Sequence, residues 1–365
     1  MADTLSRNAL PGDGPSLPDE FPSVAGPSSR VSASARATAS TLTGFRVLAT
    51  GSYAPPEAVT NEALGELGYD ADWIVQRTGI RARRRVAETV SASDLAYEAA
   101  RACLDAADAT PEEIDLILVA TMTPDHKTPS TACLLQARLG ATAPAMDLNA
   151  ACSGFVYAMV TGGMFLQQPG FSRVLVVGTD VMSHLLDPED RKTFPLFGDG
   201  AGAALLGKGS SSQGALAYEL GADGTNNELL IVPAGGSREP ASCASLEAKS
   251  HFLRMDGRPV FKWAVRTIRE SCERVLREAG VAPEEVDLVV LHQANQRILD
   301  AASSELGFLP ERNFMNLDRY GNTSAGSIPL ALDEAAREGR IGPGSRVLLC
   351  GFGAGLTWGT MLLRW

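Results

Sequence analysis

The stretch "ATPEEIDLILVAT" (109–121) decides the fold, because the chain repeats it as "VAPEEVDLVVLHQ" (281–293). Both copies pass from a Pro-Glu-Glu turn into an unbroken apolar run. A run without a polar face is typical of a strand at the centre of a sheet that helices cover on both sides. The repeat therefore predicts two equivalent α/β units in one chain.

Two further echoes follow in the same order. "RVLVVGTD" (173–180) returns as "RVLLCGFG" (346–353), and "MDLNAA" (146–151) is matched more loosely by "MNLDRY" (315–320). A stretch with helical periodicity precedes each Pro-Glu-Glu turn, at 93–108 and at 260–280. We predict a layered α/β fold in which two duplicated halves, 44–215 and 216–365, place mixed sheets around buried helices.

Glycine-rich segments at 197–207 and 351–365 are expected to close each half as hairpins. Phosphate loops are the alternative interpretation of such glycines. That alternative fails here, because no Lys-Ser/Thr pair follows them and β-forming residues flank them.

Composition narrows the function class. The chain has 365 residues, 45% of them hydrophobic, and a net charge of -11. It is long enough to bury a large core, and its acidity argues against broad nucleic-acid binding. No apolar run approaches the roughly 20 residues that a membrane span needs. We expect a globular enzyme with neither nucleic acid nor membrane as partner.

Cysteine spacing and the first residues bear on the compartment. Six cysteines lie scattered without paired spacing, so neither a disulfide framework nor a metal site is expected, which fits a reducing cytoplasm. Residues 1–43 are rich in Ser, Ala, Pro and Gly and include four acidic residues. We interpret them as a disordered extension, because a transit peptide is disfavoured by those acids.

Cys152 lies in "MDLNAACSGF" (146–155), where an apolar run breaks into small residues. It follows an expected strand and precedes the helical stretch 156–166. A thiol at a helix N-terminus lies near unpaired amides and the positive end of the helix dipole, which favour the thiolate. Taken alone, a buried packing cysteine is the commoner role for this residue type.

The second half offers two partners for this thiol. His292 ends the apolar stretch "EVDLVVLH" (285–292), and α/β folds place ligands at the ends of strands. Asn322 lies in "YGNTSAGSIP" (320–329), which by itself is typical of an ordinary turn. Fusion of the two halves could bring Cys152, His292 and Asn322 to one central site.

With these residues in place, the chain resembles β-ketoacyl-acyl-carrier-protein synthase III, the initiating condensing enzyme of the thiolase superfamily. The resemblance covers about residues 44 to 365 and leaves the first segment outside it. It runs in order through "WIVQRTGIRARR" (73–84), "NAACSGF" (149–155), "DRKTFPLFGDGAGAALL" (190–206), "GRPVFKWAV" (257–265), "LHQANQRI" (291–298), "YGNTSAGSIPLAL" (320–332) and "GFGAGLTWG" (351–359).

The resemblance implies a thiolase-like fold, an α-β-α-β-α sandwich, and a two-stage reaction in a homodimer. Cys152 takes an acyl group from acyl-CoA, and the acyl-enzyme then receives a carbanion from malonyl carrier protein. His292 and Asn322 stabilise the enolate that decarboxylation forms, and the backbone amides of Cys152 and Ala354 hold the oxyanion of acyl transfer. No cofactor is implied. The product would initiate fatty-acid synthesis or a related acyl chain.

Substrate-binding residues carry over from matching motif positions. The family binds the adenine of CoA between planar side chains, and the positions that match them here are Trp73, Arg77 and Arg191. The positions that match the family's pantetheine tunnel are Gly257, Phe261, Ala294 and Asn295. The positions at which the family docks its acidic carrier protein match Lys262 and Arg297. Arg266 and Arg269 lie on the same expected helix face as Lys262. Such a charge run is otherwise an ordinary solvated face. Glu305 departs from the family, where relatives tend to carry a basic residue.

Thr128 and Phe197 match acyl-pocket positions. Thr128 lies in "TMTPDHKTPSTA" (121–132), a loop that in this family reaches across the dimer to cap the partner's pocket. Acetyl-specific members place a bulky aromatic residue there. A threonine leaves room for several carbons, so a branched, medium or longer acyl primer is expected.

Four alternatives stay open on sequence grounds. A degradative thiolase shares the duplicated fold, but Cys350 has the wrong spacing for its second cysteine. A chalcone-synthase-like enzyme would need no basic docking helix and would lack "WIVQRTGI". A starter-unit synthase or acyltransferase of a secondary-metabolite pathway would retain all the same motifs. A non-catalytic subunit of a condensing pair is disfavoured by the intact Cys152, His292 and Asn322.

Overall fold

The computed structural model describes residues 37–65 and 67–365, and these residues fold around two five-stranded sheets. In strand order, the first-half sheet contains β2 (Phe45–Tyr53), β8 (Gly200–Lys208), β7 (Arg173–Asp180), β5 (Leu116–Ala120) and β6 (Ala145–Leu148). The second-half sheet contains β1 (Ser40–Thr43), β9 (Gly214–Ala222), β14 (Thr357–Arg364), β13 (Arg346–Gly353) and β12 (Leu288–Leu291).

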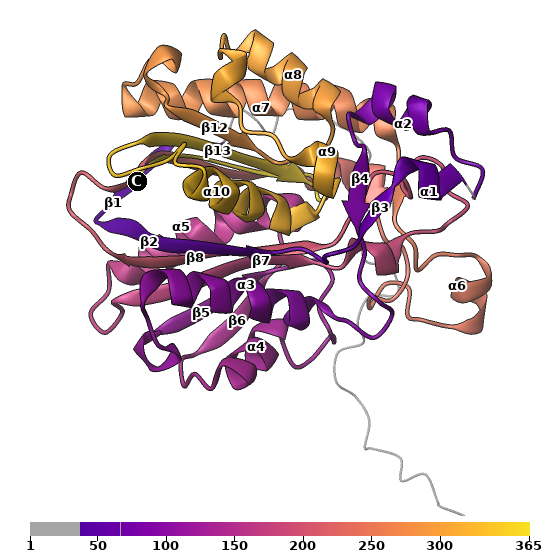
Figure 1. Ribbon diagram of the computed structural model, residues 1–365, viewed down its shortest axis with the longest axis horizontal. Coiled ribbons are helices and arrows are strands. Elements are labelled where there is room, and N and C mark those ends of the chain that lie inside the picture. Colours follow the sequence, from indigo (N-terminus) through magenta and orange to yellow (C-terminus); the bar gives the residue numbers. More distant parts are fainter. Residues whose placement is uncertain (1–36, 66) are drawn as a thin grey trace, which may run out of the picture. The chain divides into compact units, whose positions relative to one another are not determined.

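Three pairs of helices complete five layers (Figure 1). The central pair, α5 (Gly154–Leu166) and α10 (Ser327–Arg337), lies between the sheets and shares one apolar core with strands of both. The first sheet is covered on its outer face by α3 (Ala92–Ala107) and α4 (Thr131–Leu139), the second by α7 (Gly257–Ala279) and α8 (Gln296–Glu305). This arrangement confirms the predicted α-β-α-β-α sandwich, because both sheets have two apolar faces to bury.

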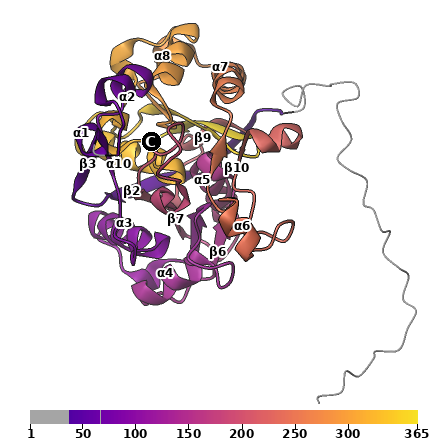
Figure 2. The same cartoon turned by 90° about the vertical axis from the view of Figure 1, so that its right-hand side faces the viewer.

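The remaining short elements gather at one end of the layers, on the right of Figure 1. Several of them, namely those at 58–60, 61–65, 71–78, 230–231 and 317–320, share a small apolar cluster with the segment 182–197. These elements are β3 (Ala58–Thr60), α1 (Asn61–Gly65), α2 (Ala71–Thr78), β4 (Ala82–Arg84), β10 (Leu230–Ile231), α6 (Cys243–Glu247), β11 (Arg254–Met255) and α9 (Leu317–Tyr320). Figure 2 shows α1, α2, α6 and the ends of α7 and α8 from that side.

The sheets repeat each other's pairing. β5 is parallel to β7, and β12 is parallel to β13. β8 then runs antiparallel to β7, as β14 does to β13, so both glycine-rich segments close hairpins as predicted. The predicted helices 93–108 and 260–280 are α3 and α7. All five residues of β5 and all four of β12 are buried, which is why their sequences have no polar face.

The duplication continues into the turns that begin the central helices. A 3-10 turn η3 (Ala151–Ser153) leads into α5, and η8 (Ser324–Gly326) leads into α10. Ala151 and Ser324 both have a positive φ, 47° and 51°. The sequence comparison paired 146–151 with 315–320 and therefore did not detect that the two turns are equivalent. The reason is that the second half has an additional helix, α9, before its turn.

The expected boundaries need one correction. Residues 40–43, assigned to a disordered extension, form β1 and pair with β9 in the second-half sheet. The ordered chain therefore begins before residue 44, and its first strand joins the opposite half. The rest of the predicted extension, 1–36, lies outside the described residues. β9 begins at Gly214, two residues before the expected start of the second half.

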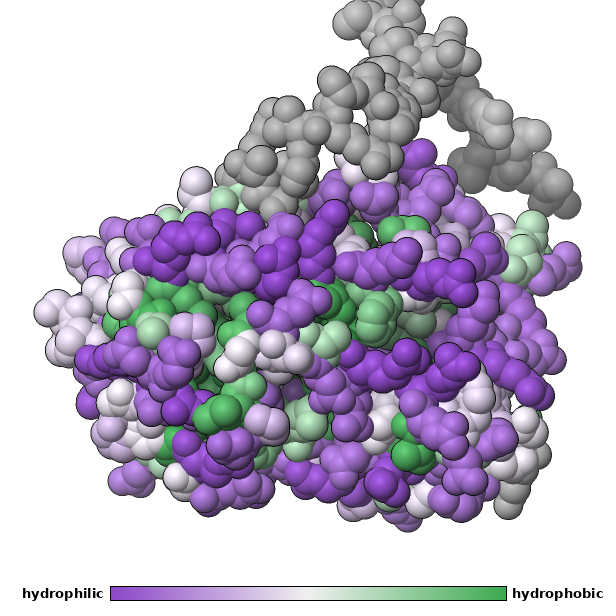
Figure 3. All heavy atoms as spheres, turned by 90° about the horizontal axis from the view of Figure 1, so that it is seen from above, coloured by the Kyte–Doolittle hydropathy of each residue, from purple (hydrophilic) through white to green (hydrophobic). Residues whose placement is uncertain are grey.

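The outer face at α7 and α8 is seen in Figure 3, where hydrophilic side chains border apolar ones. α7 buries one side, including Trp263 and Ile268, and leaves Lys262 and Arg266 exposed. Within residues 37–65 and 67–365, no helix is both long enough and apolar enough to cross a membrane.

Candidate active site

Cys152 lies at the middle of η3, just before the first residue of α5, and the amides of Ser153 and Gly154 that follow it donate to the carbonyls of Ala150 and Ala151. The end of β13 passes against it: a Cβ built on Gly353 would lie 2.8 Å from the backbone nitrogen of Cys152 and 3.2 Å from its Sγ. Only glycine allows this approach. The second half thus supplies one wall of the site around the cysteine of the first half.

Burial governs the state of this thiol. Its side chain is almost fully enclosed, with 5% of the residue exposed. Burial raises the pKa of Cys152 to about 12, a neighbouring carboxylate of Asp180 adds to the rise, and a hydrogen bond from Ser324 opposes it. The effect of the helix start, which was expected to favour the thiolate, is therefore smaller than the effect of burial on the pKa of Cys152. The thiol is neutral at pH 7, because desolvation outweighs the amides.

Ser324 joins the two halves at the nucleophile. Its Oγ lies 3.4 Å from the Cys152 Sγ, and the residue is fully buried at the first position of η8. The same side chain acts as a donor that lowers the pKa of Asp180, at the end of β7. Sequence reasoning missed Ser324. Alignment of 149–151 with 322–324 would have placed it opposite Ala151, beside the cysteine.

His292 follows β12 and is 1% exposed. Its Nδ1 lies 2.6 Å from the Ser327 hydroxyl, and its ring meets Phe352 edge-on with centroids 5.1 Å apart. Burial lowers the pKa of His292 to about 3, so the imidazole is neutral. Ser327 Oγ also accepts a weak bond from the Gln293 amide at 3.4 Å. A hydroxyl that accepts from this amide can donate to Nδ1, which leaves the proton on Nε2.

Asn322 lies in the turn before η8 and is 6% exposed. Its side-chain oxygen accepts from the Ser324 amide at 2.9 Å, so its NH₂ group is the remaining donor. Asn149 makes the same bond to Ala151 in the first half, at 3.2 Å. A short parallel bridge pairs Asn322 with Phe197, which is 3% exposed. The structure therefore places Phe197 beside the Asn322 turn.

Asp180 is a second buried group that sequence reasoning missed. One carboxylate oxygen accepts from Thr121 Oγ1 at 2.9 Å and from the Met122 amide at 2.8 Å, with Thr123 adding two more donors. The other oxygen accepts from the Ala325 amide at 3.0 Å. Burial raises the pKa of Asp180, whereas these donors act against the rise. The carboxylate ties the ends of β5 and β7 to η8, next to Cys152.

These contacts gather the three predicted side chains around η8 and the start of α10. Cys152 touches Ser324, Ser324 bonds the Asn322 side chain, and His292 is held by Ser327 one helical turn away. Gly353, which walls the thiol, precedes Ala354 at the end of β13. The geometry offers a nucleophile with a neutral imidazole and a carboxamide nearby, which is a set suited to covalent acyl transfer.

The residues predicted for CoA come from three elements that the fold brings together. Trp73, 44% exposed, and Arg77 lie on α2, and Asn295 Nδ2 donates to the Arg77 carbonyl at 3.2 Å. Ala294 precedes Asn295, and Gly257 and Phe261 lie in the first turns of α7. Arg191 sits over the Tyr69 ring at 5.9 Å, beside the loop that leads to α2. The Asn295–Arg77 hydrogen bond therefore joins α2 to the start of α8, and Arg191 lies beside the loop before α2.

The predicted docking cations differ in their surroundings. Lys262 on α7 and Arg297 on α8 are exposed, and within the described part of the chain neither forms an ion pair. Arg269 is different, because it pairs with Glu273 at 3.1 Å and with Glu305 at 3.2 Å. Glu305, the departure noticed in the sequence, thus neutralises Arg269, whereas Lys262 keeps its charge unpaired among the described residues.

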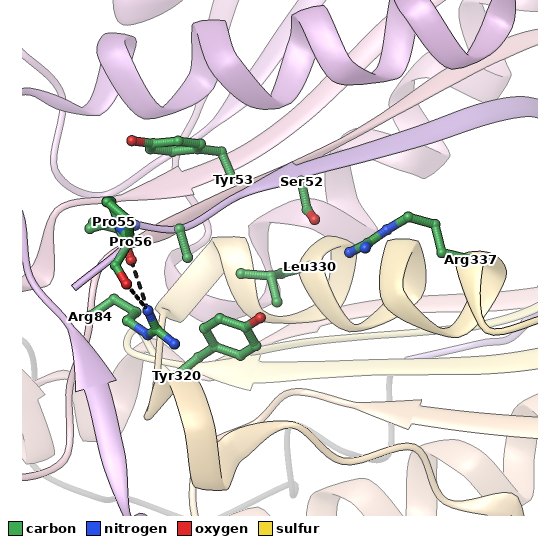
Figure 4. Close-up of a pocket in the computed structure, with 9 residues that line it drawn as sticks. Ser52, Tyr53, Pro55, Pro56, Arg84, Tyr320, Leu330 and Arg337 are labelled. Atoms are coloured by element: carbon green, nitrogen blue, oxygen red, sulfur yellow. Dashed lines mark hydrogen bonds between the residues drawn. The ribbon is translucent and has the colours of Figure 1, made fainter. Parts of the chain in front are cut away.

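Thr128 is exposed on the surface of the single chain and does not line the site of its own subunit. A separate pocket of about 240 Å³ lies beside the Asn322 turn (Figure 4), between β2, β4 and α10. In it Arg84 donates to the carbonyls of Pro55 and Pro56 and lies over the Tyr320 ring at 5.6 Å. These contacts fix Tyr320, two residues before Asn322. Within residues 37–65 and 67–365, no cluster of three metal-ligating side chains occurs.

Comparisons with known proteins bear directly on this site. The family described as 3-Oxoacyl-[acyl-carrier-protein (ACP)] synthase III matches residues 146–224, and its C-terminal counterpart matches residues 276–365. A Beta-ketoacyl-[acyl-carrier-protein] synthase III from Rhodopirellula baltica (strain DSM 10527 / NCIMB 13988 / SH1) is 57% identical over 342 residues, 89% of this chain and 99% of its own. The chain belongs to the 3-oxoacyl-[acyl-carrier-protein] synthase III family. It is a condensing acyltransferase of fatty-acid biosynthesis, which confirms the predicted class.

Solved structures of synthase III proteins agree. That of 3-oxoacyl-[acyl-carrier-protein] synthase III from Aquifex aeolicus VF5 has a TM-score of 0.81 at 42% identity, over 88% of this chain and 100% of its own. A priming beta-ketosynthase from the R1128 polyketide biosynthetic pathway also has a TM-score of 0.81, at 34% identity, over 89% of this chain and 97% of its own. The thiolase-like fold predicted from the duplication is thus the fold of synthase III.

Proposed function

We propose that this synthase III loads a primer acyl group from acyl-CoA onto Cys152 and condenses it with malonyl-acyl-carrier protein. The observation that supports this is the meeting of Cys152 with Ser324, Asn322 and His292, contributed by opposite halves. In the first step the Cys152 sulfur attacks the thioester carbon, the S–C bond forms and the bond to the CoA sulfur breaks. The departing CoA thiolate takes up the proton that Cys152 loses.

During that step, negative charge develops on the thioester oxygen. The backbone amides of Cys152 and Ala354 are the proposed donors, because the end of β13 lies against the cysteine. Amides held by a helix start and a strand end need no reorganisation as the charge develops. Loss of one such donor typically costs about 3 to 4 kcal/mol of transition-state stabilisation.

The second step releases CO₂ from the malonyl group and leaves an enolate. His292 Nε2 and the Asn322 NH₂ group are the proposed donors to its oxygen. A neutral imidazole suits this role, because burial keeps the pKa of His292 near 3 and the ring donates without gaining a proton. The carbanion then attacks the acyl carbon, the bond to Cys152 breaks, and the sulfur regains a proton. Because these side-chain donors can stabilise the negative charge of the enolate, we propose that no cofactor takes part. Unchanged activity after dialysis against a chelator would support this.

Binding of the two substrates follows from the surface around α2, α7 and α8. Trp73, Arg77 and Arg191 are proposed to hold the adenine and ribose end of CoA, and Gly257, Phe261, Ala294 and Asn295 the pantetheine arm. Lys262 and Arg297 are proposed to receive the acidic carrier protein. An exposed cation in an acidic protein steers an acidic partner to its own neighbourhood. The six free cysteines fit a reducing cytoplasm.

A homodimer and a primer larger than acetyl complete the proposal. β6 is the edge strand of its sheet and carries the half-exposed Met146, which suits pairing with a second copy. Thr128, exposed in one chain, would then cap the acyl pocket of the partner. Acetyl-CoA, isobutyryl-CoA and octanoyl-CoA offered together should give mainly the larger acyl-enzymes, and Thr128→Phe should restore preference for acetyl-CoA.

Intact-protein mass spectrometry tests the core of the proposal. Incubation with acyl-CoA should add one acyl mass to the wild type, none to Cys152→Ala, and one to the control Cys243→Ser, whose thiol is exposed on α6. Malonyl-acyl-carrier protein should then remove that mass and release CO₂. A Cys152→Ala chain that still acquires the acyl group would refute the assignment.

A starter-unit synthase of a secondary-metabolite pathway is a second candidate, favoured by the likeness to the R1128 priming ketosynthase. The chemistry would be the same and the carrier protein different. Assays with carrier proteins of fatty-acid synthesis and of a polyketide pathway separate the two, since each function predicts a preference in kcat/KM for its own carrier.

A further inference from the structure

Ser324 is the one side chain that bridges the nucleophile and a buried carboxylate. Its Oγ lies 3.4 Å from the Cys152 Sγ, and the same side chain acts as a donor that lowers the pKa of Asp180. The residue is fully buried, so water does not compete for the hydroxyl. Asp180 has at least five other donors, from Thr121, Met122, Thr123 and Ala325. Loss of the Ser324 bond therefore leaves this carboxylate well satisfied.

The backbone at Ser324 is strained in a way that fixes this hydroxyl. Its φ of 51° is uncommon for a residue other than glycine. The Asn322 side chain holds the turn by accepting the Ser324 amide at 2.9 Å. The equivalent residue of the first half, Ala151, has the same conformation with φ of 47° and no hydroxyl. The duplicated turn therefore does not need a serine to fold, and the Ser324 hydroxyl is extra.

We propose that Ser324 is a positioning residue for Cys152, whose hydroxyl turns from Asp180 to the sulfur when the sulfur becomes negative. A serine hydroxyl has one proton and two lone pairs, so it can accept from the thiol while it donates to the carboxylate. As the thiol ionises, the hydroxyl reverses and donates to sulfur. This lowers the energy of the thiolate without changing the proton count, because the thiol proton still ends on the departing CoA sulfur.

The electrostatic surroundings make such a donor necessary. Asp180 is the charged group whose field acts on the Cys152 thiol, and together with burial it opposes ionisation. The backbone of Gly351 and Gly353 on β13 also packs against the cysteine segment, and burial keeps His292 neutral. A hydrogen bond to a charged group contributes at least about tenfold in an equilibrium or rate. Ser324 supplies such a bond from a side chain.

Ser324→Ala in the full-length chain tests this, with Ser324→Gly as a second variant that also suits the positive φ. Both should show Cys152 alkylation by iodoacetamide and acylation by saturating acyl-CoA slowed by about tenfold or more, with KM for acyl-CoA unchanged. Decarboxylation of malonyl-acyl-carrier protein should stay at the wild-type rate, because the Ser324 amide still holds Asn322. Ser271→Ala removes a buried hydroxyl bonded to Thr360 in the second-half sheet and should alter none of these rates.

The proposal rests on the proposed acylation of Cys152, and the two can fail separately. A wild-type chain that takes up no acyl group defeats the proposed function, whereas alkylation by iodoacetamide still reports on Ser324. Wild-type alkylation rates in Ser324→Ala and Ser324→Gly would overturn the positioning role. So would an equal fall in acylation and decarboxylation, since that would indicate a general disturbance of the site.

Discussion

At the scale of single residues, burial sets the protonation of both reacting groups. Cys152 is held as a thiol and His292 as a neutral imidazole, because neither charged form is solvated inside the site. The thiol must therefore ionise as the substrate arrives, and the imidazole acts as a hydrogen-bond donor. The two hydroxyls of Ser324 and Ser327 contact these groups from one short segment, which makes the start of α10 the orienting element of the site.

His292 predicts how stability depends on acid. Its pKa falls to about 3 in the folded protein from 6.5, so the unfolded chain binds this proton first as the pH drops. The corresponding stability is complete above pH 6.5 and is lost as the pH falls towards 3. His292→Gln, which keeps a side-chain donor without this titration, should show a flatter fall of urea midpoint over that window. Identical slopes for both proteins would contradict the assignment.

Gly353 predicts a steric limit at the nucleophile. An added Cβ would lie 2.8 Å from the Cys152 nitrogen and 2.9 Å from its Cβ, so Gly353→Ala must displace β13 or η3. Overpacking of this kind costs about 1 to 3 kcal/mol, and acyl loading should fall at least about a hundredfold. Gly342→Ala is the control, since its added methyl meets open space. Acyl loading by mass spectrometry and thermal unfolding should report both effects; normal loading of Gly353→Ala would show that the wall is not needed.

At the scale of elements, α7 and α8 carry the proposed substrate-facing surface. Near the middle of α7, Arg269 pairs with Glu273 and Glu305, whereas Lys262, closer to the start of the helix, has no acid partner among the described residues. Arg297 and the predicted tunnel residue Asn295 lie at the start of α8. An unpaired cation gives such a surface a local positive charge in an acidic protein.

This surface predicts the outcome of charge reversal. Lys262→Glu and Arg297→Glu should each raise KM for malonyl-acyl-carrier protein by about tenfold at low salt, with little change in acyl loading from acyl-CoA. Arg277→Glu, in the last turn of the same helix, makes the same charge change far along α7 and should have little effect. Steady-state kinetics at two salt concentrations provide the measurement. An effect of Arg277→Glu equal to that of Lys262→Glu would indicate that net charge, and not this surface, governs docking.

At the scale of the whole molecule, the site exists only because the halves are fused. β1 crosses into the second-half sheet, the end of β13 walls the cysteine of the first half, and Asp180 of the first half holds the Ala325 amide of the second. α5 and α10 share one core between the sheets. The halves therefore form one cooperative unit, and neither contains a complete site.

The open edge at β6 predicts a dimer. In a two-fold symmetric dimer, both subunits contribute the same strand to the interface, so a substitution on β6 occurs there twice. Met146→Asp would therefore place two like charges at the interface, and their repulsion should dissociate the dimer. Light scattering should give twice the chain mass of 38.4 kDa for the wild type and a monomer for the variant at micromolar concentration. Met164→Asp, another exposed methionine, should remain a dimer. A monomeric wild type would remove the partner loop from the acyl pocket.

The sequence by itself determined the layers and the position of the nucleophile. Unbroken apolar runs such as 116–120 and 288–291 can be stable only between two helical layers, and their repetition fixed the number of halves. Cys152 and His292 were found because each follows a strand of that repeat closely, whereas Asn322, which was expected at a strand end, follows the helix α9. These are local patterns, and burial of apolar side chains makes them visible in one chain.

Only the tertiary structure decided what surrounds those groups. The neutral state of Cys152, the hydroxyls of Ser324 and Ser327, the carboxylate of Asp180 and the pairing of Arg269 with Glu305 all arise between residues distant in the chain. Residues 40–43 showed the same limit, because β1 becomes a strand only where β9 offers its edge. Desolvation, charge and hydrogen bonding depend on which groups meet in space, and a linear pattern does not contain those distances.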